Sequence, residues 1–245
     1  ILKFPITNVK KKKIDLIKIW GEKKINSFNY TIPSDISSSA FFIVLTLLSK
    51  KSSLIIKNVN INTSRTGCLS ILNKMGANII LKNKKIYKGE RIADICVKSK
   101  NSFRPINCPI KYNTSAIDEF LILFLVAAKA KGVSYFKNLS ELNQKESPRL
   151  KLGSKILNMI GVKTKLTNDS IKIYGNPNLK LKKTLKIKNY FKDHRVMALA
   201  TIAALTIGGS WKIFDPNCIK TSFPSFFKIL KYELGAKINW KNEKI

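Results

Sequence analysis

The sequence is poor in the residues from which metal sites, disulfides and transmembrane spans are built. Among its 245 residues only four are cysteine and one is histidine. The cysteines form no CxxC pair, and a single histidine cannot complete a zinc site, so we expect reduced thiols and no metal site. The longest apolar run, residues 196–207 with two threonines in it, is well short of the ~20 residues that cross a bilayer. We therefore expect a cytoplasmic protein, with His194 packing or orienting a neighbour rather than catalysing.

Acidic residues and arginines are also scarce. The chain has 14 Asp and Glu against 46 Lys and Arg, which gives a formal net charge of +32. Such a charge suits contacts to nucleic-acid phosphates, so a basic nucleic-acid-binding module is one interpretation. Only five of the basic residues are arginine, however, and the lysines are spread almost evenly, which favours solvated lysine-rich faces. An arginine in such a chain indicates a place where a flat, bidentate fork holds phosphate or carboxylate.

Three apolar runs, each preceded by an aspartate, divide most of the chain into related units. Asp35, Asp118 and Asp193 precede the runs, at spacings of 83 and 75 residues. Each run leads into a short alternating strand, a polar turn and a second helical pattern that ends in glycine (Gly76, Gly161 and Gly235). The period is too long for an ordinary solenoid and favours one α+β domain with three copies of a unit. We expect each copy to run helix, strand, helix, strand, strand, with residues 236–242 as a closing strand of the third.

The starts of the helices are the predicted site of function. Ser147 has the character of an N-cap, with Pro148 at the first helical position. This places Lys145 and Glu146 just outside a helix and Arg149 in its first turn. If one axis relates the three units, the helix N-termini face a common end of the domain. Unpaired N–H groups and helix dipoles would then attract anions to that end.

Residues 1–32 differ from the remainder of the chain. They alternate in the manner of β-strands (IDLIKIWG, then FNYTIP) and carry no long helical pattern. The chain also opens on ILKFPI, rather than on methionine, in the middle of a strand-like stretch. We therefore expect a piece of a longer protein, with residues 1–32 as trailing strands of an upstream domain and residues 33–245 as the three-unit domain.

Two carboxylates and two arginines stand near helix starts in positions suited to chemistry. Asp118 and Glu146 are candidates for proton transfer, and Arg149 and Arg195 are candidates for binding an anion. The alternatives are a first-turn acid stabilised by the helix dipole for Asp118, an exposed paired acid for Glu146, and structural ion pairs for the arginines. Lys145 favours the chemical interpretation of Glu146, because a neighbouring cation keeps a carboxylate ionised and oriented.

Six short segments carry a resemblance to a known family. They are DISSSAFF (35–42), TSRTG (63–67), IDEF (117–120), QKESPRL (144–150), DHRVMA (193–198) and TSFPSFF (221–227). In this order and spacing the whole chain resembles the C-terminal half of the 5-enolpyruvylshikimate-3-phosphate synthase family. The resemblance implies an enolpyruvyl-transferase-like inside-out α/β barrel domain of three βαβαββ repeats. It also implies transfer of the enolpyruvyl group of phosphoenolpyruvate to the 5-hydroxyl of shikimate 3-phosphate, with release of phosphate, in the pathway to chorismate and aromatic amino acids.

The resemblance gives the candidate residues specific roles. Asp118 would take the proton of the 5-hydroxyl and, with Lys145, bind shikimate 3-phosphate. Glu146 would be the acid and base for the methylene carbon, and Arg149 and Arg195 would bind phosphoenolpyruvate. No cofactor and no metal are implied. The partners would be these two anionic substrates, without nucleic acid or membrane, and the complete enzyme would be a monomer.

The chain departs from the family pattern at two places. Pro148 stands where many relatives carry an acid, and Thr221 stands where one branch carries an active-site lysine, with Lys220 one residue earlier. Because residues of the other half would complete the site, we expect no measurable turnover from this chain alone. UDP-N-acetylglucosamine enolpyruvyl transferase, with the same fold and chemistry, is the nearest alternative, but the KESPRL and DHR elements argue against it. The intact set of site residues argues against a catalytically inactive scaffold.

Overall fold

The computed structural model describes residues 6–11, 14–21 and 27–239. The first two units have the predicted order of helix, strand, helix, strand, strand. The first unit contains α1 (Ile36–Leu48), β3 (Ser53–Asn60), α2 (Gly67–Lys74), β4 (Asn78–Tyr87) and β5 (Glu90–Lys98). The second contains α3 (Phe120–Ala128), β6 (Gly132–Phe136), α4 (Arg149–Met159), β7 (Thr164–Leu166) and β8 (Ile171–Gly175). Their antiparallel sheets have the matching strand orders β3-β5-β4 and β6-β8-β7.

The third unit differs from the first two both before its first helix and after the strand that follows this helix. It contains β9 (Thr184–Ile187), α5 (His194–Ile207), β10 (Ser210–Ile213), the 3-10 turn η4 (Pro216–Thr221), α6 (Phe226–Lys228) and the π-turn η5 (Ile229–Glu233). The residue pattern did not indicate the leading strand β9, which pairs parallel to β10, although the βαβαββ repeat that the resemblance implies begins with such a strand. The predicted closing strand is wrong over residues 236–239, which form no strand, and residues 240–242 lie outside the described part. Within the described residues, no second strand follows α6 and η5 with which residues 236–239 could pair.

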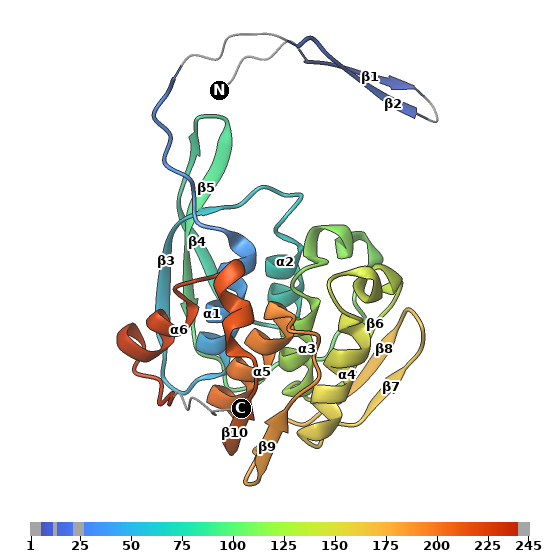
Figure 1. Cartoon of the computed structure of the whole chain (residues 1–245), viewed down its shortest axis with the longest axis vertical. Coiled ribbons are helices and arrows are strands. Elements are labelled where there is room, and N and C mark those ends of the chain that lie inside the picture. The colour runs from blue at the N-terminus through green and yellow to red at the C-terminus, as the bar shows by residue number, and fades with distance from the viewer. Residues whose placement is uncertain (1–5, 12–13, 22–26, 240–245) are drawn as a thin grey trace.

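Three apolar helices form the centre of the domain. Every residue of α3 is buried, which is the pattern of a helix enclosed on all sides. The helices α1, α3 and α5 contact one another, and the sheets of the first two units lie outside them (Figure 1). Helices inside and sheets outside make the inside-out arrangement that the resemblance implies. Among the described helices none is both long and apolar enough to cross a bilayer.

An aromatic cluster joins the first unit to the third. Phe41 and Phe42 of α1 pack edge-on against Phe226, with ring centroids 6.1 and 5.8 Å apart. Phe42 also packs against Phe223, at 5.7 Å. Phe226 is completely buried. Phe223 and Phe226 thus join the third unit to the first helix of the domain by side-chain packing.

Glycine ends two of the second helices in the predicted way. Gly76 and Gly161 have φ of +87° and +89°, a conformation that strains residues with a Cβ. After Gly76, the N–H of Ala77 donates to the carbonyl of Leu72, and after Gly161 the N–H of Val162 donates to that of Leu157. These bonds close the helices in the Schellman pattern and turn the chain into the next strand.

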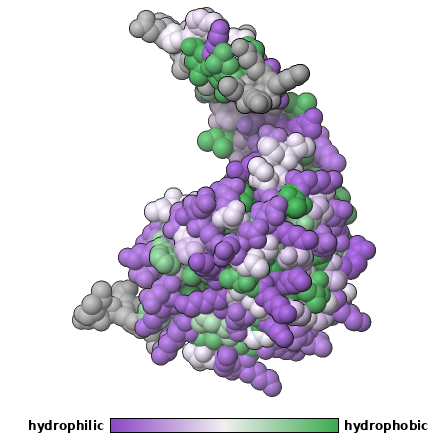
Figure 2. Space-filling model, turned by 90° about the vertical axis from the view of Figure 1, so that its right-hand side faces the viewer, coloured by the Kyte–Doolittle hydropathy of each residue, from purple (hydrophilic) through white to green (hydrophobic). Residues whose placement is uncertain are grey.

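The N-terminal part forms a hairpin apart from the three units. Strands β1 (Ile6–Lys11) and β2 (Ile14–Ile19) pair antiparallel, and the hairpin projects from the body of the molecule (Figure 1). Apolar side chains are visible on it, whereas the surface of the body is mostly hydrophilic (Figure 2). The prediction of a strand in FNYTIP is wrong, since residues 27–33 form none. This segment is held by Tyr30, which stacks on Tyr87 of β4 with centroids 5.5 Å apart.

Candidate active site

The starts of the helices meet at one end of the domain, as the three-unit pattern predicts. Asp35 caps α1, where its Oδ2 accepts from the N–H of Ser38 at 2.7 Å. Asp193 caps α5, where its Oδ1 accepts from the N–H of Arg195 at 2.8 Å. Asp118 has a different place, because it precedes Glu119, the N-cap of α3, and so lies outside the helix. Its carboxylate is therefore free to face other side chains, and the alternative of a first-turn acid is wrong.

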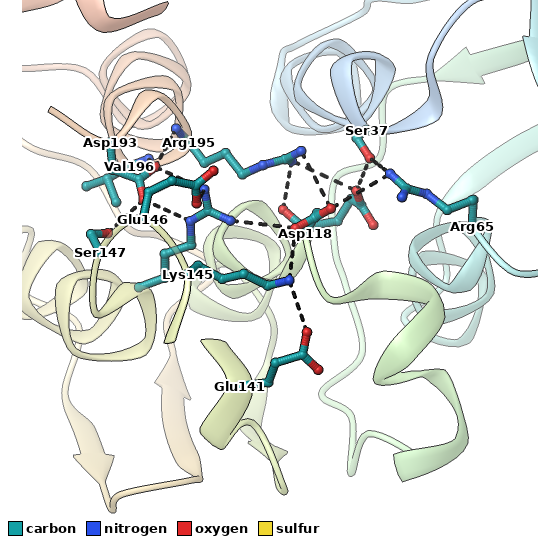
Figure 3. A network of polar contacts seen from close by, with 12 residues as sticks. Ser37, Arg65, Asp118, Glu141, Lys145, Glu146, Ser147, Asp193, Arg195 and Val196 are labelled. Carbon is teal, nitrogen blue, oxygen red and sulfur yellow. Dashed lines mark hydrogen bonds and ion pairs between the residues drawn. The ribbon is translucent and has the colours of Figure 1, made fainter. Parts of the chain in front are cut away.

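Four cationic side chains surround the carboxylate of Asp118 (Figure 3). Arg149 Nη1 lies 3.6 Å and Lys145 Nζ 4.0 Å from its Oδ1. Arg65 Nη2 lies 3.7 Å and Arg195 Nη2 3.8 Å from its Oδ2. The four cations come from different parts of the three units. The structure thereby brings together Asp118, Lys145, Arg149 and Arg195, which the sequence singled out, and adds Arg65.

Arg149 is held by carboxylates on several sides. Its Nε donates to Asp193 Oδ2 at 2.9 Å, its Nη2 pairs with Glu146, and its Nη1 faces Asp118. The side chain is only 1% exposed. Ser147 takes part as well, because its hydroxyl donates to Asp193 at 2.7 Å instead of capping α4. The predicted cap is therefore wrong, and Pro148 is the N-cap of a helix that begins at Arg149.

Lys145 and Glu146 do not pair with each other, contrary to the argument from their adjacency. Lys145 Nζ lies 3.0 Å from Glu141 and faces Asp118, whereas the partner of Glu146 is Arg149. The backbone of Lys145 is extended, with ψ of −160°. Successive side chains of an extended chain point to opposite sides, which separates the two. Glu146 is 56% exposed, so its carboxylate opens to solvent at the edge of the site.

A buried carboxylate beside Asp118 was missed in the sequence. Glu119 is 3% exposed, and Ser37 of α1 donates a hydrogen bond to it from 82 residues away. Arg195 Nη1 lies 4.0 Å from Glu119 and donates to the backbone carbonyl of Asp118 at 2.9 Å. Arg65 Nη2 in turn donates to Ser37 at 2.9 Å. The scarcity of arginine was a signal for Arg65, whereas Ser37 and Glu119 lie in the DISSSAFF and IDEF segments but were not singled out there.

Burial and charge shift several titration equilibria here. Burial raises the pKa of Glu119 above its ordinary value, against the opposing effects of the Ser37 hydrogen bond and the Arg195 charge. Burial acts in the same sense on Asp193, but the hydrogen bonds from Arg149 and Ser147 outweigh it and lower the pKa of that carboxyl. Burial and the charge of Arg195 lower the pKa of His194 below its ordinary value.

The remaining residues of interest lie outside this cluster. Lys220 is exposed in η4, and the hydroxyl of Thr221 donates to the carbonyl of Cys218 at 3.0 Å. Within the described residues, neither has a recorded contact with Asp118, Lys145 or the arginines. The same part of the chain contains no group of three His, Cys, Asp or Glu arranged to hold a metal ion.

Comparison with known proteins decides the family. Residues 2–230 match the family EPSP synthase (3-phosphoshikimate 1-carboxyvinyltransferase). The chain belongs to the EPSP synthase family. It is 39% identical over 211 residues to the 3-phosphoshikimate 1-carboxyvinyltransferase of Thermodesulfovibrio yellowstonii, covering 86% of this chain and 48% of that protein. It is 36% identical to the protein of the same name from Ruthia magnifica, covering 96% of this chain and 52% of the relative.

Solved structures agree with this assignment. The EPSP synthase of Acinetobacter baumannii superposes with a TM-score of 0.82 at 31% identity, over 94% of this chain and 52% of that one. The enolpyruvyl transferase NikO of Streptomyces tendae, at 16% identity and a TM-score of 0.71, shares the fold. The predicted inside-out α/β fold and the EPSP synthase assignment are confirmed. The chain spans about half the length of the EPSP synthases it matches.

Proposed function

We propose that this chain supplies one half of the active site of an EPSP synthase. The complete enzyme would transfer the enolpyruvyl group of phosphoenolpyruvate to the 5-hydroxyl of shikimate 3-phosphate and release phosphate. The observation that carries the proposal is the enclosure of the Asp118 carboxylate by Arg65, Lys145, Arg149 and Arg195. A base surrounded by cations suits a hydroxyl on a substrate that is itself negatively charged.

The chemistry needs two proton-transfer groups and a set of cations. In the addition, Asp118 takes the proton of the 5-hydroxyl group while the oxygen of that hydroxyl bonds to the central carbon of phosphoenolpyruvate. Glu146, acting as the acid, protonates the methylene carbon. In the elimination, Glu146 takes a proton back from the resulting methyl group as the carbon–oxygen bond to phosphate breaks. The proton held by Asp118 leaves with the phosphate. Each carboxylate therefore returns to its starting state.

Two carboxylates can hold these separate roles because their surroundings differ. Asp118 is 22% exposed and surrounded by cations, whereas Glu146 is 56% exposed and pairs with Arg149. One guanidinium thus contacts both groups, which fixes where they stand relative to each other. Lys145 would bind shikimate 3-phosphate, and Arg149 and Arg195 would face phosphoenolpyruvate. All four cysteines are free, which agrees with a cytoplasmic enzyme; we propose that the complete enzyme is a monomer without a cofactor.

Ligand discrimination by the chain itself tests the proposal. Shikimate 3-phosphate is expected to bind saturably in calorimetric titrations, whereas UDP-N-acetylglucosamine is not. With both substrates present, the isolated chain should release no phosphate, because it spans only about half of its relatives. Preferential binding of UDP-N-acetylglucosamine, or phosphate release by this chain alone, would contradict the proposal. Tight DNA binding with a steep salt dependence would instead support a nucleic-acid-binding module.

A further inference from the structure

The four cations around Asp118 differ in how free they are to meet a ligand. Arg149 is 1% exposed and is engaged by three carboxylates. Arg195 is 14% exposed and is anchored to the backbone carbonyl of Asp118. Lys145 is 27% exposed and pairs with Glu141. Arg65 is 51% exposed, which makes it the most accessible cation of the cluster.

The polar contacts of Arg65 leave most of its guanidinium free. Nη2 donates to Ser37 Oγ at 2.9 Å and lies 3.7 Å from Asp118. For Nε and Nη1 no partner is recorded within the described residues. An arginine presents its donors as a rigid fork that matches a carboxylate or phosphate. The Nε and Nη1 side of this fork is therefore available to a ligand that lies beside the carboxylate of Asp118.

The occupied side of the fork is held by a buried relay. Ser37, which is 2% exposed, accepts from Arg65 and donates to Glu119, which is 3% exposed. The relay joins the loop before α2 to the starts of α1 and α3. A side chain that is already held in place loses less conformational entropy when a ligand binds, so more of the free energy of each new hydrogen bond contributes to affinity. Arg65 is thus anchored and still able to accept a ligand.

We infer that Arg65 is a further substrate-binding residue, which contacts a carboxylate or phosphate oxygen of a substrate next to Asp118. The inference rests on the proposed function, because both proposed substrates carry these anionic groups. It assigns to the TSRTG segment a contact that Arg149, enclosed by its own carboxylates, is less free to make. Ser37 and Glu119 are positioning residues in this arrangement.

Calorimetric titrations of the isolated chain test the inference, with phosphoenolpyruvate and shikimate 3-phosphate used separately. Arg65→Gln should weaken the binding of at least one of them by about tenfold or more, through loss of a charge-assisted fork. Arg65→Lys should recover part of the loss, since it restores the charge without the fork. The ligand whose affinity falls identifies the substrate that Arg65 contacts.

Arg91→Gln is the matched control, because it removes the same charge from an exposed side chain on β5. We expect it to change either affinity by less than about twofold, since within the described residues Arg91 has no ion pair with Asp118 or Glu119 and exposed charges are screened by salt. Circular dichroism checks that every variant is folded. If Arg65→Gln and Arg91→Gln bind both ligands equally well, the inference is wrong. If Arg195→Gln weakens binding and Arg65→Gln does not, the inference about Arg65 is wrong and the proposed function stands. A wild-type chain that binds neither ligand contradicts both the inference and the proposed function.

Discussion

The Nε of Arg149 lies 2.9 Å from Oδ2 of Asp193, and the two side chains are 1% and 0% exposed. The pair joins the start of α4 to the N-cap of α5, and thereby the second unit to the third. The same guanidinium faces Asp118 and Glu146. One buried contact therefore supports both the packing of the units and the placement of the proposed catalytic groups.

Loss of this arginine should destabilise the fold. Arg149→Gln leaves the Asp193 carboxylate buried without its charge partner, which typically costs ~3–5 kcal/mol in the free energy of unfolding. Urea unfolding followed by circular dichroism measures the change. Arg91→Gln, at an exposed position, should stay within ~0.5 kcal/mol of the wild type. An Arg149→Gln variant as stable as this control would show that the pair does not support the packing.

Asp94 should make stability depend on pH in the acid range. Hydrogen bonds from the Asn58 N–H, the Asn83 side chain and Lys57 lower its pKa from 3.8 to about 2. Because the folded value is the lower one, its stabilising contribution is complete above the ordinary pKa and is lost as the pH falls from about 4 towards 2. Urea midpoints measured through this range should fall more steeply for the wild type than for Asp94→Asn.

Asp94→Asn should also lower the free energy of unfolding at neutral pH, because Asp94 accepts hydrogen bonds at an irregular part of the sheet. Both of its neighbouring strands shift register close to it, between Ile56 and Val59 in β3 and between Lys82 and Lys85 in β4. Asn58 and Asn83 have positive φ at these irregularities. Asn83→Ala, which removes one donor and keeps the carboxylate, should retain a reduced acid dependence. An unchanged pH profile in Asp94→Asn would contradict the assignment.

The aromatic cluster should contribute strongly to the stability of the third unit. Phe226→Ala removes a fully buried ring that contacts α1, and such truncations cost ~3–5 kcal/mol. Tyr232→Ala is the control, since that ring is 72% exposed, and its effect should stay within ~0.5 kcal/mol. Equal unfolding midpoints for the two variants would mean that the packing of Phe226 against α1 does not stabilise the third unit in this way.

Replacing the proposed base should separate binding from proton transfer. Asp118→Asn removes the negative charge that four cations share, so phosphoenolpyruvate should bind more tightly. One charge near the ligand in a solvated site contributes ~1 kcal/mol, which corresponds to about threefold to tenfold in affinity. Calorimetric titration measures this change. A large loss of affinity would contradict the arrangement, because it would make Asp118 an essential ligand contact instead of the charge partner of the cations.

The parts of this fold that local chemistry specifies were readable from the sequence. The helix starts after Asp35 and Asp193, the glycine-terminated helices and the apolar centre all follow from short-range patterns, although both aspartates are N-caps and not the first-turn acids that the sequence suggested. Lys145 and Glu146 were wrongly paired, because their separation depends on the extended backbone between them. The leading strand β9 is short, and its pairing with β10 spans an entire helix. Such pairing leaves little trace in a four-residue segment.

The composition of the site followed from sequence only in part. Arginine scarcity and the family resemblance drew attention to Arg149 and Arg195, and the structure places both beside Asp118. Ser37 and Glu119 look like ordinary helix-start residues, and their contact depends on the packing of α1 beside α3. The burial of Arg149 could not be predicted either, since its three carboxylate partners, Asp118, Glu146 and Asp193, are brought together only by the fold.

The most direct test of the account is where the substrates bind. Backbone amide NMR spectra of the isolated chain should be recorded while shikimate 3-phosphate and phosphoenolpyruvate are added together. The account predicts that the largest shifts fall on residues 117–119, 145–147, 149 and 193–196, where the helix starts meet around Asp118. Shifts concentrated in the groove that Lys84, Lys85 and Arg91 line between α2 and β4, or spread evenly over the lysine-rich surface, would contradict it.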